Sequence, residues 1–582
     1  MNRSGRRIRM GERLGERLDE WRLHLARPDA LIQLALLGLA TGMVAGGVIL
    51  LFRLAVEGAQ AGLLPGAEAY EALPPWLRLA LPLGGGALIG WLFHRHGRGL
   101  HVLGVARVME RMAYHQGYLS LRESLLQFAG AALTIVSGHS VGREGPHIYL
   151  GAAGGSLLGQ ALGLPNNSIR TLVGCGVAAG IAASFNTPLA GVIFSLEVVM
   201  MEYTLASFIP VILAAGSATA LSVAVFGAEP AFNIPALRPG SLAELPVWLL
   251  LGLVTGSAAA LFVQMLQSSA QFGRRLPFWQ RTTLAGLVVG AIALWVPQVM
   301  GIGYDTVDAA LTGGLGLGLL LVLVLAKMTA SAACIGLGIP GGMIGPSLFI
   351  GAVLGSLVAH LLNLALPGLG LDPGLYALLG MGAMMGASLQ APLAALTAMM
   401  ELTHSPQLIM PGMLVIVVAG LTASELFRKE SLFIAMLRAG GMDYQANPVL
   451  QTLRRTGVAG VMSKRFARPG TRVTRERAEL TLAAEPEWLL IEDEHGPSVL
   501  MPAVDLAAWM KENSDGEVDL LEIPARRYQL AGVELRATLQ EALEALRASG
   551  AEALYVKRMT APAIIRIYGV LTREQIESAY HY

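Results

Sequence analysis

The sequence has 582 residues, of which 54% are hydrophobic and 14% are charged, and its mean hydropathy is +0.56. These values exclude an ordinary soluble protein and indicate that most of the chain lies in lipid. The net charge of +1 comes without a long basic run, so we expect no nucleic-acid partner. Cys175 and Cys334 lie in apolar segments and predict buried thiols, without a disulfide framework or a metal cluster.

The charged N-terminal segment is predicted to stay in the cytoplasm. Residues 1–30 interleave arginines with acidic residues, a pattern too long and too acidic for the basic region of a signal peptide. We expect a cytoplasmic amphipathic helix here, because positive charge beside the first apolar run favours the cytoplasmic face. The expected location is the inner (plasma) membrane, crossed many times, with both termini in the cytoplasm.

Residues 31–440 form the predicted membrane body, in which a spanning helix needs about 20 apolar residues. Gly and Pro interrupt the apolar runs, which predicts tilted and discontinuous helices. Broken backbone is tolerated at membrane depth where protein or water satisfies it, as in transporter binding sites. The candidate spans are Leu31–Leu51, Trp76–Phe93, Leu126–Val136, Ile148–Leu162, Thr171–Met201, Phe208–Phe226, Leu245–Leu266, Thr283–Val299, Leu315–Ile335, Met343–Leu366, Leu375–Met400 and Leu408–Phe427.

Two sequence patterns in the membrane body occur twice. The run Gly145–Gly151 (GPHIYLG) recurs as Gly345–Gly351 (GPSLFIG). The run Ser184–Ala190 (SFNTPLA) recurs as Ser388–Ala394 (SLQAPLA). Such self-similarity indicates an internal repeat, and duplicated halves that meet at broken helices are typical of transport proteins. The predicted halves are about 31–226 and 245–440.

The composition becomes that of a soluble domain after about residue 445. Residues 441–457 are a predicted linker, and 458–582 a small cytoplasmic α/β domain. Short apolar runs between charged helical stretches divide this domain into two similar units, Val458–Asn513 and Ile523–Tyr582.

The segment GREGP contains the most informative residues. Its glycines permit a sharp turn, and Pro146 suits the first turn of a following helix. Unpaired N–H groups and the helix dipole make such a helix start an anion site. The repeat partner GMIGP has the same pattern, and two converging starts would bind an anion weakly enough to release it. The candidate anion ligands are Gly142, Arg143, Gly145, Pro146, Gly342, Met343, Ile344, Gly345 and Pro346.

Glu144 is predicted to be a gate. A carboxylate at membrane depth costs about 2.5 kcal/mol or more and is normally functional. At the helix start, a deprotonated Glu144 would occupy the place of the anion, and a protonated one would swing aside, which makes it both a gate and a proton carrier. The alternative is an ion pair between Glu144 and Arg143 in a wet vestibule.

The motifs GREGP, FNTPLAGVIFSLE and GGMIGPSLFIGA, in this order, resemble the signature segments of the CLC family of chloride channels and chloride/proton exchangers. Gly303-Tyr304 is also similar to the family pattern. The resemblance implies an all-α polytopic membrane protein with inverted repeats and discontinuous tilted helices, followed by a small α/β domain. It further implies a homodimer with one anion pathway per subunit and Glu144 as the external gate.

Several positions depart from the family pattern. The first filter segment matches weakly at Arg98 and Gly99, where an arginine replaces a serine; the alternative is a charge on the cytoplasmic face. Phe433 stands where the family has a central tyrosine, and Ile344 where it often has phenylalanine, so backbone N–H groups become the main anion ligands. Val198 replaces the second glutamate of the exchangers. Because valine cannot relay a proton, we predict a chloride channel, with a chloride/proton antiporter as the alternative.

Glu197 and Glu401 fall at equivalent positions of the two halves, where we expect helix capping or pairing across a subunit boundary. In the tail, the run Gly569–Glu574 resembles the close of a CBS domain, with Thr572 and Glu574 as candidate ligands of an adenine nucleotide; an empty cleft in a dimer-stabilising module is the alternative. We expect no other cofactor. The expected partners are chloride or similar anions, protons, a second copy of the chain and lipid.

An enzymatic function is not expected, because the sequence has no Walker loop, zinc motif or Ser-His-Asp pattern. A polytopic membrane enzyme or receptor is therefore the distant alternative.

Overall fold

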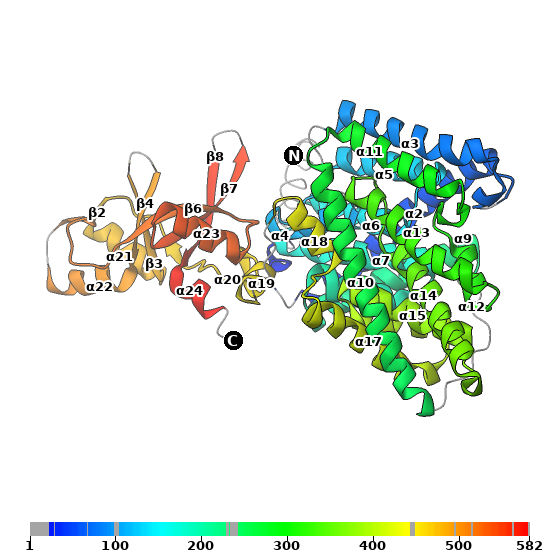
Figure 1. Ribbon diagram of the computed structural model, residues 1–582. Coiled ribbons are helices and arrows are strands. Elements are labelled where there is room, and N and C mark those ends of the chain that lie inside the picture. The colour runs from blue at the N-terminus through cyan, green and yellow to red at the C-terminus, as the bar shows by residue number, and fades with distance from the viewer. Residues whose placement is uncertain are drawn as a thin grey trace. The chain divides into compact units, whose positions relative to one another are not determined.

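The structure is a computed structural model that divides into two compact units, each described by itself (Figure 1). The first unit spans 35–160 and 170–445, and the second combines 1–34, 161–169 and 446–582. The described residues are 22–27, 30–66, 68–97, 104–228, 232, 242–442, 448–493, 496–513, 516–561 and 564–579.

The first unit is helical throughout its described residues, which confirms the predicted all-α membrane body (Figure 1). Its first half contains α2 (Leu31–Leu63), η1 (Tyr70–Ala72), α3 (Pro75–His96), α4 (Gly104–Tyr114), α5 (Leu121–Val136), α6 (Glu144–Leu162), α7 (Asn166–Phe185), α8 (Pro188–Phe194), the π-helix η2 (Ser195–Met200) and α9 (Leu205–Phe226).

The second half contains η3 (Leu242–Glu244), α10 (Leu245–Gly273), α11 (Phe278–Ala293), η4 (Pro297–Val299), α12 (Tyr304–Leu311), α13 (Leu317–Gly336), α14 (Ile344–Ala365), η5 (Pro367–Leu369), α15 (Pro373–Leu389), α16 (Pro392–Thr403), η6 (Pro406–Leu408), α17 (Ile409–Leu421), the π-helix η7 (Thr422–Leu426) and α18 (Leu432–Ala439).

Among the described residues, eight helical segments are long and apolar enough to cross a membrane. Two predicted spans are wrong in extent, because each is broken into two helices. Thr171–Met201 is interrupted at Asn186, whose φ is +58°, and Leu375–Met400 is interrupted at Gln390, whose φ is +53°. In both cases a proline follows two residues later and starts the next helix, since it cannot donate the N–H that a continuing helix needs.

The sequence repeat produces equivalent packing in the two halves. A methyl group on Gly151 would lie 2.2 Å from the carbonyl oxygen of Gly176, which places the backbones of α6 and α7 in close contact. In the second half, a methyl group on Gly351 would lie 2.3 Å from the carbonyl oxygen of Gly380, in α14 and α15. Small residues allow this close approach of membrane helices.

Equivalent residues of the halves also pair directly. The Gly142 N–H donates to the Gly342 carbonyl at 2.9 Å, and the Gly342 N–H donates back to the Gly142 carbonyl at 2.7 Å. This antiparallel exchange between equivalent positions requires a local two-fold axis. The repeat seen in the sequence is therefore a symmetric pair of structures that meet at the two glycine-rich segments.

The same axis relates two acidic caps. Glu197 accepts from the N–H groups of Leu393 and Ala394, at 3.2 and 2.8 Å, at the start of α16. Glu401 correspondingly accepts from two N–H groups at the start of α8, those of Leu189 at 2.8 Å and Ala190 at 2.7 Å. Each carboxylate thus satisfies free N–H groups of a helix in the other half.

The second unit contains the predicted α/β domain (Figure 1). Its first repeat has β1 (Phe466–Ala467), β2 (Arg472–Thr474), α21 (Arg475–Ala483), β3 (Trp488–Asp493), β4 (Gly496–Pro502), α22 (Ala503–Glu512) and β5 (Glu517–Asp519). Its second repeat has β6 (Tyr528–Glu534), α23 (Leu539–Ser549), β7 (Ala553–Ala561), β8 (Ile564–Thr572) and α24 (Arg573–Ser578). The predicted linker includes α19 (Pro448–Arg455), and α20 (Val458–Val461) follows it.

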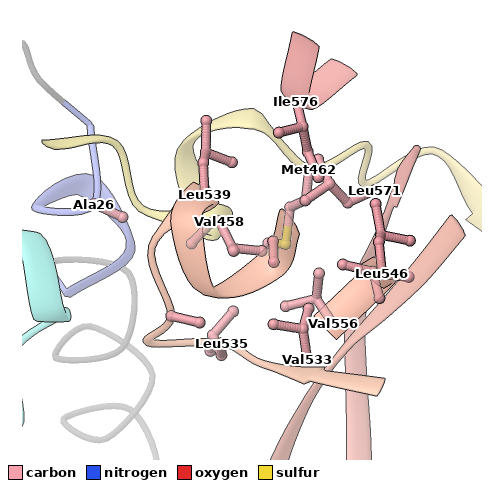
Figure 2. Close-up of a cluster of buried hydrophobic side chains, with 14 of the residues drawn as sticks. Ala26, Val458, Met462, Val533, Leu535, Leu539, Leu546, Val556, Leu571 and Ile576 are labelled. Atoms are coloured by element: carbon pink, nitrogen blue, oxygen red, sulfur yellow. The ribbon is translucent and has the colours of Figure 1, made fainter. Parts of the chain in front are cut away.

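One six-stranded sheet, in the order β1-β3-β4-β6-β7-β8, joins the two repeats. In each repeat a parallel pair, β1 with β3 or β6 with β7, is followed by an antiparallel hairpin, β3 with β4 or β7 with β8. Figure 2 shows the core of the second repeat, where side chains of α20, α23 and α24 converge on those of the strands. This core includes Val458, Met462, Val533, Leu539, Leu546, Val556, Leu571 and Ile576, together with Ala26 from the N-terminal segment.

We expect Glu197→Ala to lower the stability of the protein by about 1–3 kcal/mol, because it leaves two N–H groups of α16 without their acceptor. Glu401→Ala should cause a similar loss through α8. Thermal unfolding in detergent measures both effects, and Glu401→Gln, which keeps one acceptor oxygen, should lose less. Unchanged unfolding temperatures for both alanine variants would contradict the capping role.

Candidate functional site

The candidate site lies where two helices begin. α6 starts at Glu144 and α14 starts at Ile344, and the Gly142–Gly342 pairing holds their glycine-rich approaches together. A methyl group on Gly145 would lie 2.6 Å from the Cα atom of Gly342, so the two segments are in backbone contact. The two helix N-termini predicted from the sequence therefore do converge.

The Glu144 side chain is fully buried between these helix starts. Its Oε2 accepts from the Gly345 N–H at 3.2 Å, and its Oε1 accepts a hydrogen bond from the Tyr304 hydroxyl. A methyl group on Gly142 would lie 2.0 Å from the same Oε2. The carboxylate thus occupies the space next to the Gly345 N–H, which is the place predicted for the anion.

The Arg143 side chain contacts Ser184 and Tyr304 and not the neighbouring Glu144 carboxylate. Its Nη2 lies 3.5 Å from the Ser184 carbonyl oxygen, and its guanidinium lies 5.2 Å from the centre of the Tyr304 ring. The alternative in which Arg143 and Glu144 form a simple ion pair is therefore not the arrangement in the structure. Arg143 instead places a positive charge beside the tyrosine that donates to Glu144.

A cavity of about 340 Å³ lies beside this tyrosine. Its lining includes two arginines, Arg53 and Arg143, and four acidic residues. A cavity of this volume with so many polar groups is suited to hold water. We call this cavity the vestibule. Its lining consists of Phe52, Arg53, Val56, Glu57, Gln60, Glu68, Ile135, Arg143, His147, Ile302, Tyr304, Asp305 and Asp308.

Residues 85–424 match the family model described as voltage gated chloride channel. The chain belongs to this family, the CLC family. It is 36% identical over 374 residues to a putative chloride channel protein ClcB-like of Ralstonia nicotianae, covering 63% of this chain and 86% of that protein. It is 29% identical over 354 residues to the H(+)/Cl(−) exchange transporter ClcA of Vibrio cholerae, covering 59% of this chain and 76% of that protein.

Among solved structures, a eukaryotic CLC transporter matches with a TM-score of 0.62 at 17% identity, over 94% of this chain and 98% of that one. This likeness concerns the fold alone, and its extent takes in the α/β repeats as well as the helices. The CLC resemblance inferred from the motifs is confirmed.

The remaining residues that the sequence predicts as anion ligands are found in part within the described residues of this CLC protein. Met343 and Ile344 are buried, and Ile344 lines a cavity of about 20 Å³. Phe433 is buried at the start of α18, with its ring edge-on to Phe194 at 6.2 Å. Arg98 and Gly99 fall outside the described residues, so their filter role stays a prediction.

Val198 is buried in the π-helix η2. Its neighbour Glu197 is committed to the α16 cap described above. In the tail, the Thr572 hydroxyl accepts from the Gln575 N–H as the cap of α24, while Glu574 is exposed. Nucleotide binding at Thr572 and Glu574 stays a prediction.

Lys327 was not predicted from the sequence to have a role. This lysine is fully buried in α13, and its Nζ donates to the carbonyl oxygens of Val299, Gly301 and Ile302 at 3.1–3.2 Å. Its signal was present, because a single lysine inside the apolar run Leu317–Gly336 is an intramembrane charge that requires a reason. The lysine fixes the segment that leads into Tyr304.

Glu68 was also missed, and the sequence around it carries no signal for a functional role. It lies between α2 and η1, outside the spanning helices, with a left-handed φ of +54°. Burial raises the pKa of its carboxyl group; Arg143 opposes that rise, and Asp305 adds to it. Glu68 thus supplies the vestibule with an acid that holds its proton to higher pH than an exposed glutamate does.

We expect Gly142→Ala to reduce anion flux by about tenfold or more, because the added methyl group would fill the space that the carboxylate or an anion occupies. The double variant with Glu144→Gln should be equally slow. Flux from proteoliposomes measures both, with Gly47→Ala as the control, since a methyl group there meets no atom within 4 Å. Normal flux in Gly142→Ala would place the anion elsewhere.

Proposed function

We propose that this CLC protein exchanges chloride for protons across the membrane, with Glu144 carrying the proton. The observation that carries the proposal is the position of the Glu144 carboxylate on the Gly345 N–H between two helix starts. There a carboxylate and an anion compete for the same N–H groups. Protonation removes the charge of the carboxylate and frees the site, so the presence of a proton on Glu144 and of an anion in the site are linked.

Three further features support exchange. The vestibule is lined by charged groups and by Tyr304, whose hydroxyl donates to the Glu144 carboxylate. The backbone N–H groups bind an anion without a full positive charge that would trap it. A relative that is 29% identical carries the name of an H(+)/Cl(−) exchange transporter. Exchange therefore replaces the channel as the leading proposal.

The channel is the second candidate, because Val198 offers no proton and Glu197 is held by two N–H groups. In a channel, Glu144 would open and close the pathway with protons that enter and leave through one mouth. The homodimer, the cytoplasmic termini and the CBS-like nucleotide site are parts of the proposal carried over from the family resemblance.

An imposed chloride gradient should drive protons uphill in proteoliposomes if the protein is an exchanger, because each anion that enters the site displaces the proton-linked carboxylate. A proton-sensitive dye and a chloride electrode record both fluxes in one preparation, and empty liposomes are the control. Chloride flux without uphill proton movement would establish the channel. Repeating the assay with fluoride compares the two anions at the same site.

Glu144→Gln should leave anion flux high and independent of pH, because the amide mimics the protonated acid and cannot give up a proton. Uphill proton movement should disappear in the same variant. Glu425→Gln, which alters an exposed acid of η7 that is not part of the vestibule lining, should retain the pH dependence. Wild-type pH dependence in Glu144→Gln would overturn the gate assignment.

A further inference from the structure

We propose that Tyr304 is a positioning residue that latches the deprotonated Glu144 side chain in the place of the anion and thereby sets the pH at which transport begins. The proposal rests on the proposed function of Glu144 and deepens it. It starts from the hydrogen bond that the Tyr304 hydroxyl donates to Glu144 Oε1, on the side of the carboxylate opposite its contact with the Gly345 N–H.

The tyrosine ring is fixed by its neighbours. Phe232 packs against it with ring centres 4.8 Å apart and an interplanar angle of 64°, and Phe185 lies 6.4 Å away. The Arg143 guanidinium lies 5.2 Å from the ring centre. A ring held by aromatic contacts and by a cation keeps its hydroxyl in one place, so the donor is ready whenever the carboxylate returns.

The backbone that carries Tyr304 is fixed as well. Tyr304 is the first residue of α12, and Gly303 before it has a left-handed φ of +82°. A side chain on Gly303 would lie 2.8 Å from the Phe349 ring, so glycine is needed at this turn. Lys327 donates to three carbonyl groups of the segment before Gly303, and its Nζ lies 4.6 Å from the centre of the Phe349 ring.

This arrangement favours one protonation state of Glu144. A hydrogen bond donated to a carboxylate is stronger than one donated to a neutral acid, since the charge assists it. The Tyr304 hydroxyl therefore stabilises the closed, deprotonated gate more than the protonated one. Opening requires a proton to move from vestibule water to Glu144, after which the weakened contact with Tyr304 can break and the side chain can leave the site.

Other charged groups also bear on the pH at which Glu144 takes up a proton. They come from α2, the connection after α2, the residue before α6, α6 itself, α12 and α13, and they are unchanged when only the Tyr304 hydroxyl is altered. The groups are Arg53, Glu57, Glu68, Arg143, His147, Asp305, Asp308 and Lys327.

Tyr304→Phe removes the hydroxyl and keeps the ring. We expect the midpoint of the flux–pH curve to move to higher pH by about one unit, because the deprotonated carboxylate loses a charge-assisted donor. At a fixed pH above the wild-type midpoint, flux should rise by up to about tenfold. The measurement is chloride flux from proteoliposomes over a range of pH.

Tyr376→Phe is the matched control. The Tyr376 hydroxyl donates to a carboxylate oxygen of Glu244 at 2.9 Å, so this variant also removes a buried tyrosine–carboxylate hydrogen bond, but one that does not involve Glu144. Its flux–pH midpoint should equal that of the wild type. A second control places Tyr304→Phe in the Glu144→Gln protein, where the substitution should have no effect on the pH profile.

Fluorotyrosine at position 304 tests the latch without removing any group. A more acidic phenol donates a stronger hydrogen bond, so 3-fluorotyrosine should move the midpoint to lower pH, opposite to Tyr304→Phe. The proposal is overturned if both changes leave the midpoint where it is while Glu144→Gln still abolishes pH dependence. If Glu144→Gln itself keeps the wild-type profile, the proposed function fails first, and the latch fails with it.

Discussion

The structure depends on one electrostatic arrangement, in which α6 and α14 begin next to each other and the Gly345 N–H at the start of α14 faces a buried carboxylate. Backbone N–H groups and helix dipoles provide a partial positive charge that attracts an anion and also lets it leave. A carboxylate satisfies the same groups, and Glu144 does so through the Gly345 N–H. In the proposed function, one site accepts either an anion from solution or the Glu144 carboxylate. This competition is the physical basis of both gating and coupling.

The two-fold repeat explains how a chain can build such a site. Each half contributes one helix start, and the Gly142–Gly342 pairing brings the two starts together without any side chain. The reciprocal caps of Glu197 and Glu401 hold the same halves together at α16 and α8. Symmetry ends at Glu144, because Ile344 stands at the equivalent position of the second half. In the proposed function the repeat supplies the binding site, and this one departure from the repeat supplies its control.

Much of this arrangement could be predicted from the sequence, because it is local. Glycine and proline mark the helix starts in GREGP and GMIGP, and a carboxylate in an apolar region draws attention by its cost. The contact between Tyr304 and Glu144 could not be predicted in the same way, since only the tertiary fold joins residues so distant in the chain. The breaks at Asn186 and Gln390 were missed because apolar periodicity continues across a change of backbone direction. Lys327 was missed although its signal was local.

The difference between a channel and an exchanger then depends on water. Under the proposed function a proton reaches Glu144 from the vestibule, and a gate that exchanges protons with one side of the membrane alone opens and closes without coupling. Exchange needs a second route for protons to Glu144. Neither Val198 nor the capping Glu197 supplies one in this conformation. The cavity of about 20 Å³ beside Ile344 has room for a single water molecule, but its lining is apolar apart from Thr187, and apolar cavities of this size stay dry. Coupled transport therefore requires that water enter this region during the cycle, so the residue that replaces the second glutamate matters less than the hydration of the space around it.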